Sequence, residues 1–142
     1  TGGKNMELLF RGTKDGMSAD VFHNKYNNKG QTITLIKNEK GYIFGGFASI
    51  DWASCGGWRS SPNNFLFTLM NKYEIAPTKF PNTDTNYSMY DYYTCGPYFG
   101  SAPDIYINFP NNISTSFPAS YNDVTGKNIQ FLQEIIIILI PI

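Results

Sequence analysis

Charged side chains are scarce in this sequence. They make up 15% of the 142 residues, and 11 basic residues are balanced by 11 acidic ones. An average domain has about 25% charged residues. A chain with zero net charge has no general attraction for nucleic acid or anionic lipid. A weakly charged surface also favours association, so composition argues against a nucleic-acid partner and for a protein one.

Histidine and cysteine are nearly absent, which limits the available chemistry. His23 is the only histidine, and a lone imidazole beside Phe22 on a short predicted helix is more often a packed or capping residue than a catalyst. Cys55 and Cys95 form no CxxC pair, so two free thiols in a reducing compartment fit them at least as well as one disulfide. A Cys–His pair between His23 and either cysteine is neither supported nor forbidden by the sequence.

Long apolar runs, phosphate loops and metal-binding motifs are missing too. The run Ile135 to Ile140 is far shorter than the ~20 residues of a membrane helix, so we expect no membrane insertion. Gly45–Gly46 and Gly56–Gly57 lack the GxGxxG or GxxxxGK[ST] setting of a phosphate loop. The aspartates, none spaced like a known metal loop, fit turn positions better than a carboxylate pair: Asp15, Asp20, Asp51, Asp84, Asp91 and Asp104. We therefore expect no catalytic residue, cofactor or metal.

What the sequence does contain is a strand-rich pattern organised around one hairpin. Gln31 to Ile36 alternates polar and apolar residues, and a polar connection ending on Gly41 joins it to a second β-rich run. Gly45–Gly46 interrupts that second run. Because glycine has no Cβ, such a pair marks either a bulge or a place where another backbone or a large ring packs closely.

The other elements follow from similar local signals. A helix is predicted from Ala19 to Tyr26, because Ser18 offers an N-cap and the apolar residues share one face. Further strands are predicted at Met6–Arg11, Asn64–Met70, Asp104–Phe109 and Ile129–Ile140, with a short one near Tyr87–Tyr92. The connections are predicted to be a loop at 53–62, a long excursion at 77–92, a turn at 96–100 and a loop at 111–120.

These elements predict an α+β, mainly β fold, a two-sheet antiparallel β-sandwich flanked by short helices. Residues 1–5 are read as the end of a linker or an added tail, and residues 6–142 as one domain. Trp52 and Trp58 are either core anchors or interface anchors. Loops on a rigid sandwich often carry recognition, so Trp58, with Arg59 beside it, is the candidate partner-binding site. Several tyrosines resemble a stacking surface but lack the interleaved basic residues of a nucleic-acid site: Tyr87, Tyr90, Tyr92, Tyr93 and Tyr98.

The order of these segments resembles the TLDc domain, the module of the oxidation-resistance proteins and their relatives. The segments that carry the resemblance are Leu8 to Ala19 with Phe22–His23, Thr34 to Lys37, Gly41 to Phe47, Trp52, Phe65 to Leu69, Gly96 to Gly100 and Asp104 to Ile107. The positions that it marks as structural motif residues are Gly45, Gly46, Trp52, Gly96, Pro97, Phe99 and Gly100.

This resemblance implies a sandwich with no established catalytic centre, an association with cytosolic subunits of the vacuolar-type proton-pumping ATPase, and a link to oxidative-stress resistance. We therefore expect a non-catalytic, cytoplasmic interaction module at the cytosolic face of endomembranes, within a larger multidomain chain or assembly. Two alternatives stay open: a redox-active or hydrolytic enzyme using Cys55, Cys95 or His23, and a structural domain of a larger assembly. Thiol reactivity distinguishes the redox alternative from the interaction module, because a redox scavenger needs an exposed cysteine of low pKa.

Overall fold

The computed structural model describes residues 10–11, 18–37, 40–109, 112–127, 129, 131 and 136–141. In chain order the elements are β1 (Phe10–Arg11), α2 (Ala19–Tyr26), β2 (Thr32–Lys37), β3 (Ile43–Ala48), β4 (Gly57–Arg59), β5 (Phe65–Met70), β6 (Thr78–Pro81), η1 (Thr85–Tyr87), β7 (Met89–Asp91), β8 (Tyr98–Phe99), β9 (Ile105–Asn108), β10 (Asn112–Ser114) and β11 (Ile136–Pro141). No helix in these ranges is long and apolar enough to cross a membrane.

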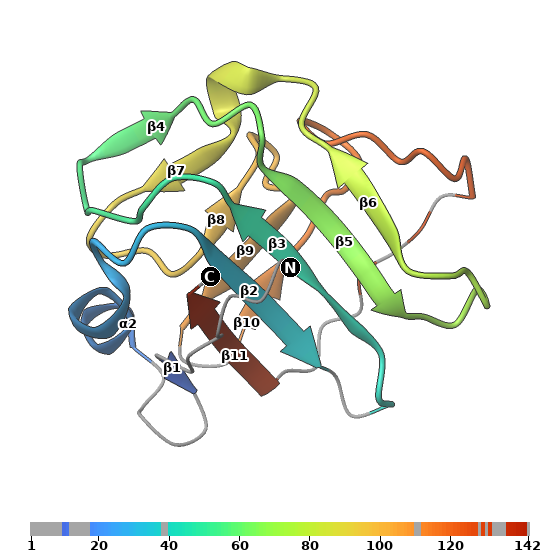
Figure 1. Ribbon diagram of the computed structural model, residues 1–142, viewed down its shortest axis with the longest axis horizontal. Coiled ribbons are helices and arrows are strands. Elements are labelled where there is room, and N and C mark those ends of the chain that lie inside the picture. The colour runs from blue at the N-terminus through green and yellow to red at the C-terminus, as the bar shows by residue number, and fades with distance from the viewer. Residues whose placement is uncertain are drawn as a thin grey trace.

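The strands form one large sheet and two small ones. The large sheet has six strands in the order β1-β11-β2-β3-β5-β6, all neighbours antiparallel, and β10-β9-β8 lie behind it (Figure 1). β4 and β7 form a separate two-stranded ribbon. The predicted α+β, mainly β class of layered antiparallel sheets is confirmed. The strands outside the large sheet are divided between a three-stranded and a two-stranded sheet.

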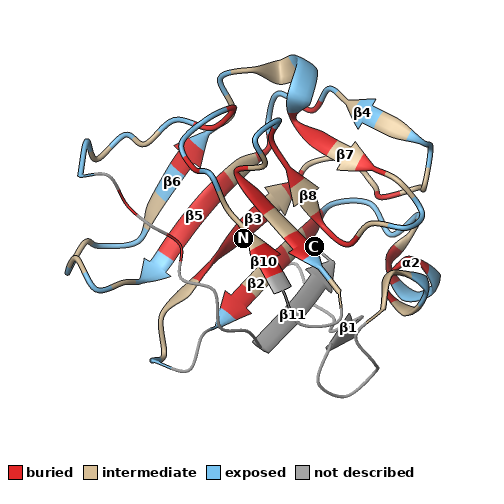
Figure 2. Cartoon of the chain, turned by 180° about the vertical axis from the view of Figure 1, so that it is seen from behind, coloured by how far each residue is buried: buried red, intermediate tan, exposed pale blue. Residues whose placement is uncertain are grey.

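The predicted central hairpin is confirmed as β2–β3. Thr32 lies opposite Ala48 at one end, and Lys37 lies opposite Ile43 at the other. Gly41, at φ +82°, lies in the connection, where a left-handed conformation favours glycine. Seen from behind, buried positions run along β3 and β5, whereas β4 is more exposed (Figure 2). The hairpin is therefore the middle of the sheet that backs the core.

Close packing explains the glycine pair. A Cβ on Gly46 would lie 2.7 Å from the Phe99 ring, which comes from the opposing sheet. A Cβ on Gly45 would collide with the Thr34 carbonyl and lie 2.9 Å from the Phe67 ring. The register of the β3–β5 pair shifts between Ile43 and Phe44, not at Gly45 or Gly46. Of the two predicted explanations, the close approach of a ring and a backbone holds at these positions, and the bulge does not.

Trp52 is a core residue. It is fully buried, and its indole Nε1 donates to the Thr32 hydroxyl over 3.2 Å. The ring meets Phe99 at nearly a right angle with centroids 5.7 Å apart. Helix α2 packs onto the same ring through Phe22, at 5.9 Å. Trp52 therefore joins the helix, the hairpin and the second sheet.

Helix α2 has the bounds that the sequence predicts. The Val21 backbone N–H donates to the Ser18 hydroxyl over 3.2 Å, which confirms Ser18 as the N-cap. Phe22, His23 and Tyr26 are its buried residues, so one face lies on the core. A short helix of this kind is stabilised mainly by such packing.

Several short strands were missed, and one predicted strand is shorter. β4 lies in the predicted loop 53–62, β6 in the excursion 77–92, β8 in the turn 96–100 and β10 in the loop 111–120. Strands of two to four residues are too short to show an alternating pattern. β7 confirms the short strand predicted near Tyr87–Tyr92, and β11 begins only at Ile136, after Ile129 and Phe131, which are buried outside any strand. Residues 1–9, including the predicted tail, and 132–135 lie outside the described residues.

Candidate partner-binding surface

Trp58 lies at the centre of a group of aromatic rings. It is on β4, opposite Tyr90 of β7, and it is 38% exposed. Its ring centroid is 5.0 Å from that of Tyr90, 5.1 Å from that of Tyr87 and 5.4 Å from that of Tyr98. The Tyr87 and Tyr98 rings meet the indole nearly edge-on, the arrangement that aromatic pairs prefer. Trp58 is therefore exposed yet held by its neighbours.

The group extends in both directions. Tyr98 packs against Tyr106 at 4.5 Å, and Tyr90 leads through Tyr92 to Tyr93, which is 57% exposed. We call the whole group the aromatic surface: Trp58, Tyr87, Tyr90, Tyr92, Tyr93, Tyr98 and Tyr106. Desolvation and the neighbouring Cys95 raise the pKa of Tyr106 to about 12, so its hydroxyl stays protonated at neutral pH. The sequence analysis named all of these residues except Tyr106 and grouped the five other tyrosines as a possible stacking surface, but it did not place Trp58 among them.

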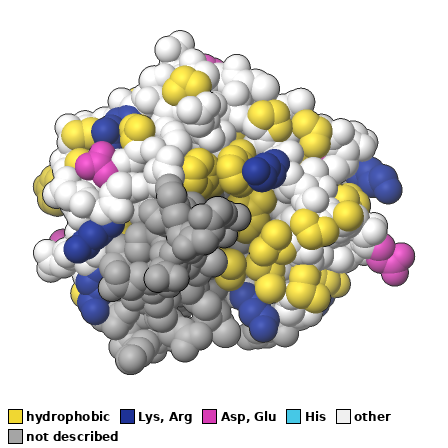
Figure 3. All heavy atoms as spheres, in the orientation of Figure 1, with side chains coloured by type: hydrophobic (Ala, Val, Ile, Leu, Met, Phe, Trp, Pro, Cys, Tyr) yellow, Lys and Arg dark blue, Asp and Glu magenta, His cyan; other side chains and the backbone are white. Residues whose placement is uncertain are grey.

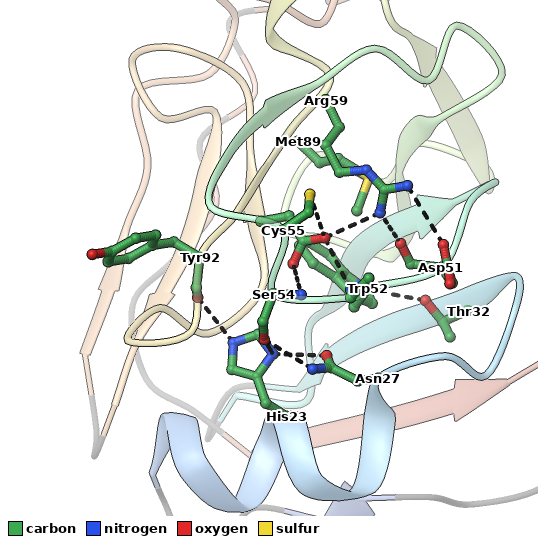
Figure 4. Close-up of polar contacts among 12 residues, drawn as sticks. His23, Asn27, Thr32, Asp51, Trp52, Ser54, Cys55, Arg59, Met89 and Tyr92 are labelled. Atoms are coloured by element: carbon green, nitrogen blue, oxygen red, sulfur yellow. Dashed lines mark hydrogen bonds and ion pairs between the residues drawn. The ribbon is translucent and has the colours of Figure 1, made fainter.

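Arg59 forms ion pairs with two aspartates of the same chain. Its Nη2 lies 3.5 Å from Asp51 Oδ1 (Figure 4), and its Nη1 lies 3.0 Å from Asp91 Oδ2. Nη1 also donates to the Asp51 carbonyl oxygen. Successive side chains of a strand leave opposite faces, so Arg59 supports from below the strand that presents Trp58. A contact between Arg59 and a partner stays a prediction.

Asp91 is the buried anion at this support. It has no exposed surface, and it accepts the backbone N–H groups of Ala53 and Ser54, each over 2.9 Å. The Cys55 thiol donates to the same carboxylate over 3.4 Å. A buried charge persists only when it is paired and hydrogen-bonded, and Asp91 meets both conditions. The carboxylate therefore ties the segment after Trp52 to β7.

His23 is a structural crosslink. Its Nδ1 lies 2.8 Å from Asn27 Oδ1 and 3.1 Å from Ser54 Oγ. Its Nε2 lies 3.0 Å from the Tyr92 carbonyl oxygen (Figure 4). The same nitrogen lies 2.7 Å from the Cys95 carbonyl oxygen. Carbonyl oxygens only accept, so Nε2 carries a hydrogen. The buried ring thus joins helix α2 to two loops, and its contact with Cys95 is to the backbone carbonyl.

Both cysteines are free thiols. Although Cys55 is exposed as a residue, local desolvation raises the pKa of its thiol, and the hydrogen-bonded Asp91 carboxylate raises it further. A raised pKa lowers the thiolate fraction, which is the reactive form. In the described part of the chain, no three His, Cys, Asp or Glu side chains are grouped to hold a metal. These contacts favour a structural role for the polar residues.

The remaining motif residues also have structural contacts. A Cβ on Gly96 would collide with the Ile107 carbonyl and lie 2.6 Å from the Phe109 ring. The Pro97 carbonyl accepts the Ile107 backbone N–H over 2.9 Å, which aligns this turn with β9. The turn that precedes β8 is therefore fixed by its fit against β9.

Asp104, which lies between β8 and β9, has an anchoring role similar to that of Asp91. Its buried carboxylate accepts the backbone N–H groups of Ala119, Ser120 and Tyr121 over 2.8 to 3.1 Å. Desolvation raises its pKa, and these hydrogen bonds oppose the rise. Gly100, at φ +83°, lies so close to this carboxyl group that a Cβ would collide with it. No local sequence signal distinguishes Asp91 or Asp104 from an ordinary turn aspartate.

Comparison with known proteins gives two matches. A family model described as the TLDc domain matches residues 1–137. A zebrafish (Danio rerio) protein named MTOR-associated protein MEAK7 is 34% identical over 62 residues, which cover 44% of this chain and 14% of that protein. The chain therefore matches only a small part of the length of that relative.

Proposed function

This chain belongs to the TLDc domain family, and on this premise we propose that it is a protein-interaction module that binds its partner through the aromatic surface. Proteins of this family are generally regarded as non-catalytic. The observation that carries the proposal is the exposure of Trp58 within a fixed group of tyrosines. Tryptophan and tyrosine are the residues most enriched at interface positions that dominate binding energy.

The setting of Trp58 supports this role. A side chain that is already held in place loses little conformational freedom on binding, so more of the contact energy remains as affinity. The tyrosines around it supply further apolar area and hydroxyl groups, and the Arg59–Asp91 pair stiffens the ribbon beneath. The surface is thus suited to a partner that inserts or receives a large side chain.

For the partner, the cytosolic subunits of the vacuolar-type proton-pumping ATPase are our first candidate, by family resemblance. The name of the zebrafish relative, MTOR-associated protein MEAK7, also supports a role in protein association. We propose that the module acts in the cytoplasm, at the cytosolic face of endomembranes, within a larger chain or assembly, and contributes to oxidative-stress resistance through its partner. The contacts of Cys55 and His23 do not favour the enzymatic alternative.

A pull-down tests the partner assignment. The immobilised chain is incubated with purified cytosolic pump subunits, and wild type is compared with Trp58→Ala. Val124→Ala is the matched control, because Val124 is an exposed apolar residue outside the aromatic surface. Circular dichroism first establishes that all three proteins are folded. We expect wild type and the control to retain subunits and Trp58→Ala to lose most of them; no retention by wild type would contradict the pump assignment.

A further inference from the structure

The outer face of the six-stranded sheet carries an apolar hollow that the proposed function does not use. It has a volume of about 340 Å³, and apolar side chains from β2 and β5 form its walls. Side chains of this kind gather over the part of the face formed by β3, β5 and β6 (Figure 3). The size falls in the range of about 300–1,000 Å³ that is typical of small-molecule sites.

The strand pattern explains why the hollow is apolar. In β2, Thr32, Thr34 and Ile36 are buried toward the core, so Ile33 and Leu35 take the outer positions. In β5 the outer positions are Phe65, Phe67 and Leu69, and Leu69 is 40% exposed. An antiparallel sheet with one solvated face normally places polar residues there. Here all five positions are apolar; Phe67 is buried, Ile33, Leu35 and Phe65 are partly exposed, and Leu69 is exposed. A contiguous apolar patch of this kind is typical of binding surfaces.

Gly45 lies between two residues that line the hollow. In the cross-strand row it lies between Leu35 and Phe67, so no side chain rises from the middle of that row. The tip of the Phe67 ring comes within 2.9 Å of the place where a Cβ on Gly45 would be. The Phe67 ring therefore packs over Gly45, where the missing side chain makes room for it, and it is only 7% exposed.

One cation stands at the rim. Lys79 of β6 is exposed, lines the hollow and holds its Nζ 4.6 Å from the centre of the Phe65 ring. Among the residues that the structure describes, it makes no ion pair. The other polar side chain of the lining, Thr78, already donates its hydroxyl to the Ala76 carbonyl over 2.7 Å. The described residues that line the hollow thus provide apolar walls and a single positive charge.

We propose that this hollow binds a long-chain carboxylate, with the alkyl chain between the β2 and β5 side chains and the carboxylate at Lys79. An alkyl chain has no polar group to leave unsatisfied, whereas an extended peptide would bring backbone N–H and C=O groups to walls that offer them no partner. One cation suits one anionic head group, and a membrane surface would instead call for a cluster of basic residues. The site is separate from the aromatic surface.

Calorimetric titration with dodecanoate, below its micelle concentration, tests the proposal. We expect one saturable site per chain, with dodecanol and dodecyltrimethylammonium binding at least about fivefold more weakly because they lack the pairing charge. Leu69→Asp should weaken binding by more than about tenfold, because it places a carboxylate in the apolar wall. Met70→Asp is the matched control: Met70 is the next residue, is more exposed at 56% and does not line the hollow. It should bind within about twofold of wild type.

A second measurement needs no variant. Amide chemical shifts of the wild-type chain, followed during the dodecanoate titration, should move mainly in β2, β3, β5 and β6. Equal binding of the alcohol or the ammonium compound would overturn the role of Lys79. The absence of saturable binding, shifts confined to other strands, or binding to anionic vesicles without binding to free dodecanoate would overturn the site.

Discussion

The guanidinium of Arg59 lies 3.0 Å from the carboxylate of Asp91, directly beneath the strand that carries Trp58. Asp91 has no exposed surface and Arg59 is 24% exposed, so the pair lies at the boundary between core and solvent. The exposed Trp58 and the buried Asp91 therefore belong to the same two-stranded ribbon of β4 and β7.

Replacing Asp91 should destabilise the fold. Asp91→Ala removes one of the two carboxylates that Arg59 contacts, and it leaves the Ala53 and Ser54 N–H groups without their acceptor. We expect a loss of about 3 kcal/mol in the free energy of unfolding, because two backbone N–H groups lose their acceptor and Arg59 loses its buried ion-pair partner. Urea denaturation measures it. Asp20→Ala, at an exposed helix position, serves as the control and should cost less than about 1 kcal/mol. Equal stability of the two variants would contradict the anchoring role.

The glycine pair gives a second prediction. Gly46→Val should lower the free energy of unfolding by about 3 kcal/mol or more, because its side chain would overlap the Phe99 ring. The matched control is Gly57→Val, also in a strand, where nothing lies within 4 Å of an added Cβ. Thermal melts of both variants supply the comparison. If Gly46→Val had the same melting temperature as Gly57→Val, the two sheets would not pack as described.

The helix and the hairpin could be predicted from sequence because their signals are local. Ser18 caps its own helix, and Gly41 closes its own hairpin connection. β4 could not be found, since the hydrogen bonds of three residues are made to β7, where Trp58 faces Tyr90. The hydrophobic periodicity of a short segment does not indicate which distant strand it pairs with.

The candidate site was predictable only in part for the same reason. Trp52 and Trp58 lie in similar loop sequence, yet one is fully buried and the other is 38% exposed, because only the tertiary fold places Phe99 against the first. The aspartate anchors were not predictable, because the N–H groups that Asp91 and Asp104 accept belong to distant loops.

The reactivity of Cys55 provides a prediction that depends on pH. Its thiol pKa is raised, so its thiolate fraction at neutral pH is below that of an unperturbed cysteine. In a Cys95→Ser variant, which leaves Cys55 alone, the iodoacetamide alkylation rate should rise with pH to a midpoint above that of free cysteine. Reaction with peroxide at pH 7 should be no faster than that of free cysteine. A midpoint below that of free cysteine would revive the redox alternative.

The central claim is that Trp58 anchors a protein partner. The most direct test is the dissociation constant for a captured pump subunit, measured by surface interferometry with wild type, Trp58→Ala and Val124→Ala, each shown to be folded. Truncating an anchor costs about 2 kcal/mol or more, so Trp58→Ala should bind roughly thirtyfold more weakly while Val124→Ala matches wild type. A Trp58→Ala dissociation constant within about twofold of wild type would contradict the account.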